Sequence, residues 1–287
     1  MAVTANTNIS SISASRSLYE TRKDLSQAME RLASGKRING AADDAAGQTV
    51  VSRMKAQITS LNQAIRNTND GISMVSTYEG AADEIEDILI RMRELAVLAS
   101  NDSYTVQDAS NAYLEFAALA SEIDRIQSKT KFNGSVDVAS NATITYSFQV
   151  GFNGGDAVAV SFNSLAASQL MGGVYTSTTT GFMASAHTTM ASVVELASAA
   201  ISGLDAGLSN LNVARATAGA AINRLEHTVS NLMNVVQRTE EARSRVEDAD
   251  FATESAALAR ANVLTQAGSA MLAQANQSPQ YILALLR

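Results

Sequence analysis

The sequence predicts a mainly α-helical protein, a long antiparallel coiled-coil rod that folds back on itself, with a small β-hairpin in the middle of the chain. Apolar residues recur at steps of three, four and seven through both halves of the chain, which is the period of packed helices. Alanine, the residue with the highest helix propensity, is abundant, and the chain has a single proline. Strict alternation of apolar residues occurs in the middle of the chain, as in a pair of strands.

The N-terminal half carries two helical patterns. In the first, Leu18, Leu25 and Leu32 lie seven residues apart, and the pattern stops near residue 35. The second runs from about 43 to 99 without a proline, so we expect one very long helix. At about 1.5 Å per residue it would extend about 85 Å. Its apolar stripe continues through Ile85, Leu89, Met92, Ala96 and Ala99.

The period changes in the middle of the chain. A shorter helix is expected over about 104–128, and Asn133-Gly134 is typical of a turn. Apolar residues then alternate over 144–150 and 158–162, on either side of a glycine-rich connection. This pattern predicts a β-hairpin over about 140–163. Because a lone hairpin is only marginally stable in water, it should rest on a helix.

The helical pattern resumes near residue 191, is interrupted by the acidic run 247–250, and returns from about 253. Because the middle of the chain is short, we expect the two halves to run antiparallel and to bring both termini to one end. Apolar side chains of the facing helices should form a rod seam of Ile58, Leu61, Ile65, Ile222, Leu225, Val229 and Leu232.

The C-terminal tail from Ala261 to Leu286 carries no charge. Residues 1–40 contain six basic and three acidic residues, and 247–287 contain two basic and four acidic ones, so the two ends can attract each other. One partner helix covers only one stripe of the tail, and an uncharged helix is unsuited to exposing its other faces. We therefore expect self-assembly.

Composition argues against several functional classes. The chain has no cysteine, which excludes disulfides and thiolate metal sites, and it has only two histidines. No nucleotide-binding or serine-hydrolase motif is present, so we expect no catalytic, cofactor or metal site. A net charge of −7 and 5% aromatic residues disfavour nucleic acid. No apolar run of membrane-spanning length and no signal-peptide pattern is seen, so membrane insertion is not expected and composition alone suggests the cytoplasm.

Long stretches of the chain closely resemble bacterial flagellin, the subunit of the flagellar filament. The matching segments are MERLASGKRINGAADDAAGQTVVSRMKAQI (29–58), NQAIRNTNDGISMVSTYEGAADEI (62–85), RMRELAVLASN (91–101) and 245–287. The resemblance implies an inner-tube domain of 1–42 and 247–287 and a rod domain of 43–170 and 188–246. The side chains expected to pack in the inner tube, called the inner-packing residues, are Ile9, Leu18, Leu25, Leu32, Leu258, Leu264, Met271, Ile282 and Leu285. A short Gly/Ser/Thr loop at 171–187 stands where many flagellins carry outer domains.

The resemblance also implies partners and a location. Flagellins polymerise with copies of themselves and meet flagellar cap, hook-junction and export-chaperone proteins. They lack a cleaved signal because they leave the cell unfolded through the flagellar type III apparatus and fold at the filament tip. This implication replaces the cytoplasmic assignment with an extracellular filament. Two alternatives remain open, a discrete coiled-coil oligomer such as an adhesin and a hook–filament junction protein.

The helix around residues 90–100 resembles the surface by which a host Toll-like receptor senses many flagellins. Matched position by position, this surface comprises Leu89, Arg91, Leu95 and Glu115. In the family the same patch is buried between subunits, so the resemblance implies a role in assembly first. Without the resemblance, the charged residues here would be read as an ordinary solvated helix face.

Overall fold

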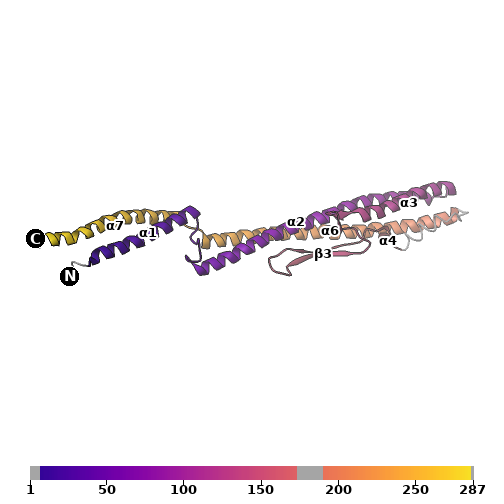
Figure 1. Ribbon diagram of the computed structural model, residues 1–287. Coiled ribbons are helices and arrows are strands. Elements are labelled where there is room, and N and C mark those ends of the chain that lie inside the picture. Colours follow the sequence, from indigo (N-terminus) through magenta and orange to yellow (C-terminus); the bar gives the residue numbers. More distant parts are fainter. Residues whose placement is uncertain (1–6, 173–189, 286–287) are drawn as a thin grey trace. The chain divides into compact units, whose positions relative to one another are not determined.

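A computed structural model describes residues 7–172 and 190–285, with side chains of the last helix described through residue 277 (Figure 1). The mainly helical class with one small hairpin is confirmed. The elements are α1 (Ile9–Ser34), α2 (Ala45–Ala99), α3 (Val106–Lys129), β1 (Lys131–Phe132), β2 (Val136–Asp137), β3 (Ile144–Gln149), β4 (Ala157–Phe162), α4 (Ala167–Leu170), α6 (Met190–Glu247) and α7 (Phe251–Leu285).

The chain forms two compact units, which are described separately. The terminal unit comprises 1–58 and 237–287, and the rod unit comprises 59–236. This division falls inside α2 and α6, whereas the expected domain limits at 42 and 247 lie near the breaks between consecutive helices. The expected domain limits therefore stay a prediction. Residues 173–187 of the expected loop at 171–187 lie outside the described residues.

In the rod unit, α2 and α6 run antiparallel. Arg93 near the end of α2 binds Asp205 in the first part of α6, with 2.7 Å between Nε and Oδ1. Leu61, early in the rod unit, packs with Leu232, which lies far along α6. Of the expected seam residues, Ile58, Leu61, Leu225 and Leu232 are buried, and Ile65, Ile222 and Val229 are half-buried.

The third helix completes the core of the rod unit. α3 begins at Thr105 with a capping box, in which the Thr105 side chain accepts from the backbone N–H of Asp108 and the Asp108 carboxylate accepts from that of Thr105. The helix then buries Tyr113, Phe116 and Ile123 against the same core as α2 and α6. Most of the stripe predicted for α2, from Ile85 through Ala96, faces this core.

Acid should weaken the start of α3. Hydrogen bonds from the Thr105 side chain, and then from its backbone N–H, hold the pKa of Asp108 below its ordinary value of 3.8. A lowered folded pKa gives stability that is present above pH 3.8 and is lost as the pH falls through the folded value. We expect a carboxyl titration followed by NMR to give a pKa below 3.8, and the Asp108→Ala variant to lose this acid dependence. A titration midpoint above 3.8 would contradict the capping box.

The hairpin rests on α2, as expected. β3 and β4 pair antiparallel in the register Ile144↔Phe162 through Gln149↔Ala157. The Tyr78 hydroxyl donates to the Asn163 carbonyl at 3.0 Å, and Asn67 Nδ2 donates to the Gln149 carbonyl at 3.2 Å. Burial raises the pKa of Tyr78 to about 12. Two side chains of one helix therefore hold the hairpin at both of its ends.

Gly71 lies between these two hydrogen bonds, where the ring of Phe148 approaches the helix backbone. A Cβ atom at Gly71 would meet that ring at 3.2 Å, whereas a Cβ atom at Gly80, farther along the same helix, would meet nothing within 4 Å. Glycine inside a helix costs about 1 kcal/mol relative to alanine. Glycine at position 71 therefore leaves room for the Phe148 ring, which a larger side chain would push against.

Gly80→Ala should stabilise the rod unit by about 0.5–1 kcal/mol, because it removes backbone freedom from the unfolded chain without a clash. Gly71→Val should destabilise the unit by about 1–3 kcal/mol, because its side chain must displace Phe148. Denaturant unfolding followed by circular dichroism measures both changes. If the two variants shift stability in the same direction, Phe148 does not press on α2 at this point.

Three local features differ from expectation. The strands β1 and β2 flank the expected Asn133-Gly134 turn, whose residues have φ of 51° and 72°. The short helix α4 follows β4, and neither β1–β2 nor α4 is long enough to show a period in sequence. Finally, Ser278-Pro279 has the pattern of a helix start, yet α7 continues through both residues.

Within residues 7–172 and 190–285, α6 alone contains an 18-residue window apolar enough to cross a membrane, with a mean hydropathy of 1.3. Core helices of soluble proteins have the same composition, and α6 buries Val193, Leu204 and Leu211 in its own chain. The expectation of no membrane insertion stays a prediction.

Candidate assembly surfaces

The terminal unit is built on a single pair of antiparallel helices, α1 and α7 (Figure 1). At one end of the pair, Asn8 contacts Ala275. In the middle, a Cβ atom at Gly268 would lie 3.2 Å from the Leu18 side chain. At the other end, Arg31 Nη1 lies 3.1 Å from Glu254 Oε1. The pairing places the start of α1 and the end of α7 at the same end of the helix pair, as the antiparallel arrangement of the halves predicts.

The break after α1 is joined to the break before α7. α1 ends at Gly35, whose φ of 69° is readily adopted only by glycine. The Gly35 carbonyl accepts from the Ala249 N–H at 3.0 Å, and the Arg37 N–H donates to the Glu247 carbonyl at 2.7 Å. Lys36 Nζ also lies 2.5 Å from Glu247 Oε1, whose residue is only 8% exposed.

Two carboxylates order the connections next to this junction. Asp43 accepts from the backbone N–H groups of Asn39 at 3.0 Å and Gly40 at 3.1 Å, and these bonds lower its pKa. Asp250 accepts from the Thr253 hydroxyl at 2.7 Å, which lowers its pKa, and from the backbone N–H of Ala252 at 3.0 Å, which caps the start of α7. The acidic run at 247–250 therefore ends one helix and starts the next.

The contact between α1 and α7 buries only a narrow stripe. Among the described side chains of these two helices, the buried ones are Leu18, Ala28 and Ala261. Small residues allow the helices to approach closely, but they bury little apolar area. Since burial contributes about 25 cal/mol per Å² of apolar surface, this stripe contributes much less than the rod core.

Most large apolar side chains of the pair face away from its contact. Ile9, Tyr19, Phe251 and Met271 are each at least 64% exposed. The full set of exposed large apolar residues, which we call the open face, is Ile9, Ile12, Tyr19, Met29, Phe251, Val263, Leu264 and Met271. Exposed apolar patches of this kind commonly mark an interaction site.

The expected inner-packing residues divide between the contact and the open face. Leu18 is buried, Leu25, Leu32 and Leu258 are half-buried, and Ile9, Leu264 and Met271 are exposed. Ile282 and Leu285 lie beyond the described side chains. Sequence reasoning missed Ala28, Ala261 and Gly268, because small residues give a weak signal. It also missed Tyr19, which lies seven residues after Ile12 and follows the helical period.

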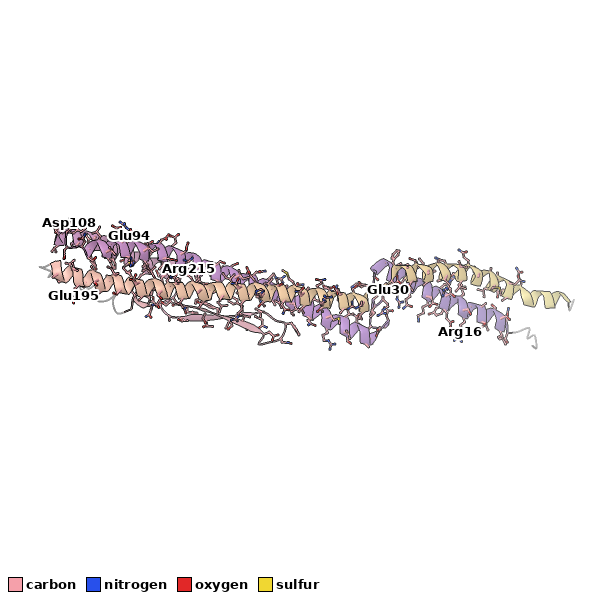
Figure 2. All side chains as sticks on the ribbon, turned by 180° about the vertical axis from the view of Figure 1, so that it is seen from behind. Arg16, Glu30, Glu94, Asp108, Glu195 and Arg215 are labelled. Carbon is pink, nitrogen blue, oxygen red and sulfur yellow. The ribbon has the colours of Figure 1, made fainter. Side chains whose placement is uncertain are left out.

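A second candidate surface lies on α2 and α3 of the rod unit. Arg91 Nε donates to Glu115 Oε1 at 2.9 Å, and Arg91 Nη1 donates to Glu94 Oε2 at 2.9 Å. These bonds raise the pKa of Arg91, and the bond to Glu115 has the larger effect. All three residues are exposed, and Glu94 is labelled on α2 in Figure 2.

The structure corrects the composition of this surface. Leu89 is 0% and Leu95 is 5% exposed, because both side chains pack in the rod core. Of the four expected residues, only Arg91 and Glu115 reach the surface, together with the unexpected Glu94. Arg91, Glu94 and Glu115 thus form an exposed ion-pair network at this surface.

Comparison with known proteins gives consistent matches. A family model described as bacterial flagellin N-terminal helical region matches residues 5–143, and one described as bacterial flagellin C-terminal helical region matches 201–286. Flagellin of Halalkalibacterium halodurans is 40% identical, covering 98% of this chain and 99% of the relative. The flagellar filament 31.3 kDa core protein of Treponema maltophilum is 36% identical, covering 98% of this chain and 99% of the relative. A crystal structure of Bacillus cereus flagellin is 28% identical with a TM-score of 0.44, covering 58% of this chain and 88% of that one.

Proposed function

The chain belongs to the bacterial flagellin family, and we propose that it is the repeating structural subunit of an extracellular flagellar filament. In this role the protein catalyses no reaction. It supplies stiffness and shape to a passive propeller, so its functional residues are those that pack one copy against the next. The terminal helices would form the inner tube, and the rod unit would surround them.

The open face is the observation that carries this proposal. α1 and α7 expose large apolar side chains, and the sequence of α7 after Arg260 carries no charge before Arg287. A helix of this composition is stable in water only when its remaining faces are covered. Further copies of the same chain present matching apolar faces, and a helical polymer can cover them on every side.

Export and growth follow the family pattern in this proposal. The chain leaves the cell unfolded through the flagellar type III apparatus, with an export chaperone as its partner, and adds at the filament tip beneath the cap protein. The base of the filament meets a hook-junction protein. The absence of cysteine and the single proline suit a chain that must fold after export, because neither disulfides nor many slow proline isomerisations delay it.

Seeded growth tests the proposal. Purified chain is mixed with short flagellar filament fragments and imaged by negative-stain electron microscopy. Long fibres of uniform width are expected. Discrete particles would instead support a coiled-coil oligomer or adhesin, and short caps on the seeds that stop growing would support a junction protein.

Receptor recognition is a separate proposal about the α2–α3 surface. With Leu89 and Leu95 in the core, it depends on Arg91 and Glu115 as the exposed members of the expected set. Reporter cells that express the Toll-like receptor are treated with monomeric chain. A response that is lost in Arg91→Ala supports recognition at this surface, and no response at high concentration ends the proposal.

A further inference from the structure

Methionine is the only sulfur-containing residue of the chain, because the sequence has no cysteine. Peroxides oxidise a thioether to a sulfoxide without the help of an enzyme, and exposed side chains react first. A peroxide at low dose therefore finds no thiol to attack in this chain. Its effect on the protein depends on which methionines it can reach.

The structure separates the methionines into a buried and an exposed group. Those that lie in the core of the rod unit are Met74, Met92 and Met171. Among the described side chains, the exposed methionines are Met29 on α1, Met233 on α6 and Met271 on α7. A low dose of peroxide should therefore oxidise the exposed group and spare the rod core.

Two of the three exposed methionines belong to the open face. Met29 directly follows the buried Ala28, so its side chain is turned by about 100° from the contact with α7. Met271 is 64% exposed, so it is not part of that contact either. Oxidation at these two positions therefore leaves the contact between α1 and α7 in place. Met233 lies in the rod unit, outside the open face.

Oxidation changes the polarity of a methionine side chain without changing its charge. The Sδ atom donates an electron pair to one peroxide oxygen, so that a sulfur–oxygen bond forms and the oxygen–oxygen bond breaks. Sulfur is oxidised by two electrons, and hydrogen peroxide is reduced and leaves as water. A thioether accepts hydrogen bonds only weakly, whereas the sulfoxide is polar. Covered by apolar side chains, the new oxygen loses its water and gains no donor, which is unfavourable.

We propose that Met29 and Met271 are oxidation sites through which a peroxide controls assembly. A sulfoxide at either position keeps a soluble subunit from joining the fibre, because the open face would then bury an unpaired acceptor. A subunit that has already joined is protected, because the neighbouring copies that cover the open face also exclude the peroxide. This inference rests on the proposed function, since it describes the regulation of the same surface.

The modification can be reversed, which separates it from general damage. Methionine sulfoxide reductases, one for each sulfoxide epimer, return the side chain to the thioether. Chain that has been oxidised at low dose should therefore regain its growth on seeds after treatment with both reductases. Growth that stays lost after the sulfoxides have been reduced would place the damage elsewhere and overturn the proposal.

The partition of partly oxidised chain between fibre and solution tests the proposal without any substitution. Native soluble chain is treated with hydrogen peroxide and grown on seeds of isotopically labelled chain, whose peptides are thereby distinguished. Fibre and supernatant are separated by sedimentation, and peptide mapping by mass spectrometry gives the sulfoxide fraction at each methionine. Sulfoxide at Met29 and at Met271 should be at least about threefold less abundant in the fibre than in the supernatant. Sulfoxide at Met233 should be equally abundant in both.

Leucine variants locate the effect. Leucine is close to methionine in volume but cannot be oxidised. The critical concentration for seeded growth is measured for each variant with and without peroxide, so that each variant is its own baseline. Peroxide should raise it about tenfold in the native chain and in the control Met233→Leu. In the double variant Met29→Leu/Met271→Leu the rise should be less than about threefold. If the double variant does not grow at all, the partition of the native chain decides.

Two results would overturn the proposal while the native chain still grows. One is an equal sulfoxide fraction at Met29 and Met271 in fibre and supernatant, or a depletion at Met233 as large as theirs. The other is equal sensitivity to peroxide in the native chain and the double variant. Failure of the proposed function looks different, because untreated native chain then does not grow on seeds, and regulation of assembly falls with the filament role.

Discussion

Met271→Glu should abolish fibre growth while leaving the rod unit folded. Met271 is 64% exposed on α7, so a glutamate at this position is solvated in the lone chain and costs little there. In a polymer that covers the open face, each added subunit would bury one unpaired carboxylate, which costs several kcal/mol. The critical concentration for seeded growth, measured by sedimentation, should therefore rise at least about 100-fold.

Met271→Gln separates charge from shape in this experiment. Glutamine matches glutamate in size, is neutral, and resembles the neutral polar residues already present in α7, such as Gln266 and Gln274. Its critical concentration should stay within about tenfold of the native value. The thermal unfolding of the rod unit should be the same in both variants. Normal growth of Met271→Glu would show that this face stays in water after assembly.

Arg215→Ala should destabilise the rod unit by about 1–3 kcal/mol. Arg215 lies on α6 (Figure 2) and faces three carboxylates of α2. Its Nη2 lies 3.0 Å from Asp83 and 3.9 Å from Glu79, and its Nη1 binds Glu86. Without the guanidinium, the three carboxylates would lose the cation that they share. The effect is limited because Asp83 is 66% exposed and water screens it.

Two further variants sharpen this test. Arg215→Lys keeps the charge but lacks the planar guanidinium that can bind several carboxylates at once. It should therefore recover only part of the stability. Arg238→Ala removes an arginine on the same helix whose side chain is 81% exposed, and the change should stay within about 0.5 kcal/mol. Equal denaturation midpoints for Arg215→Ala and Arg238→Ala would mean that the three carboxylates do not need Arg215.

The long helices and the hairpin could be predicted because their signals repeat. Leu225 and Leu232 share a seven-residue period, and the alternation in β3 and β4 fixes which side chains face α2. The apolar stripe had already placed Leu89 in the core. The resemblance placed the same residue on a surface, and the structure supports the stripe, since Leu89 is fully buried.

The polar contacts between α1 and α7 could not be predicted. Asn8 and Ala275 are 267 positions apart, and one hydrogen bond leaves no period in the sequence. Ser278-Pro279 has the local pattern of a helix start, yet α7 continues through both residues. Arg215 likewise gave no signal, since its three partners lie on another helix.

Amide hydrogen exchange of residues 261–277, compared between the soluble chain and its seeded fibres, tests the central claim most directly. The narrow stripe between α1 and α7 cannot protect this segment well by itself, so we expect rapid exchange in dilute soluble chain and strong protection in the fibre. The rod core around Leu89 should be protected in both. Equal, strong protection of residues 261–277 in the dilute soluble chain would contradict the claim that neighbouring copies cover the open face.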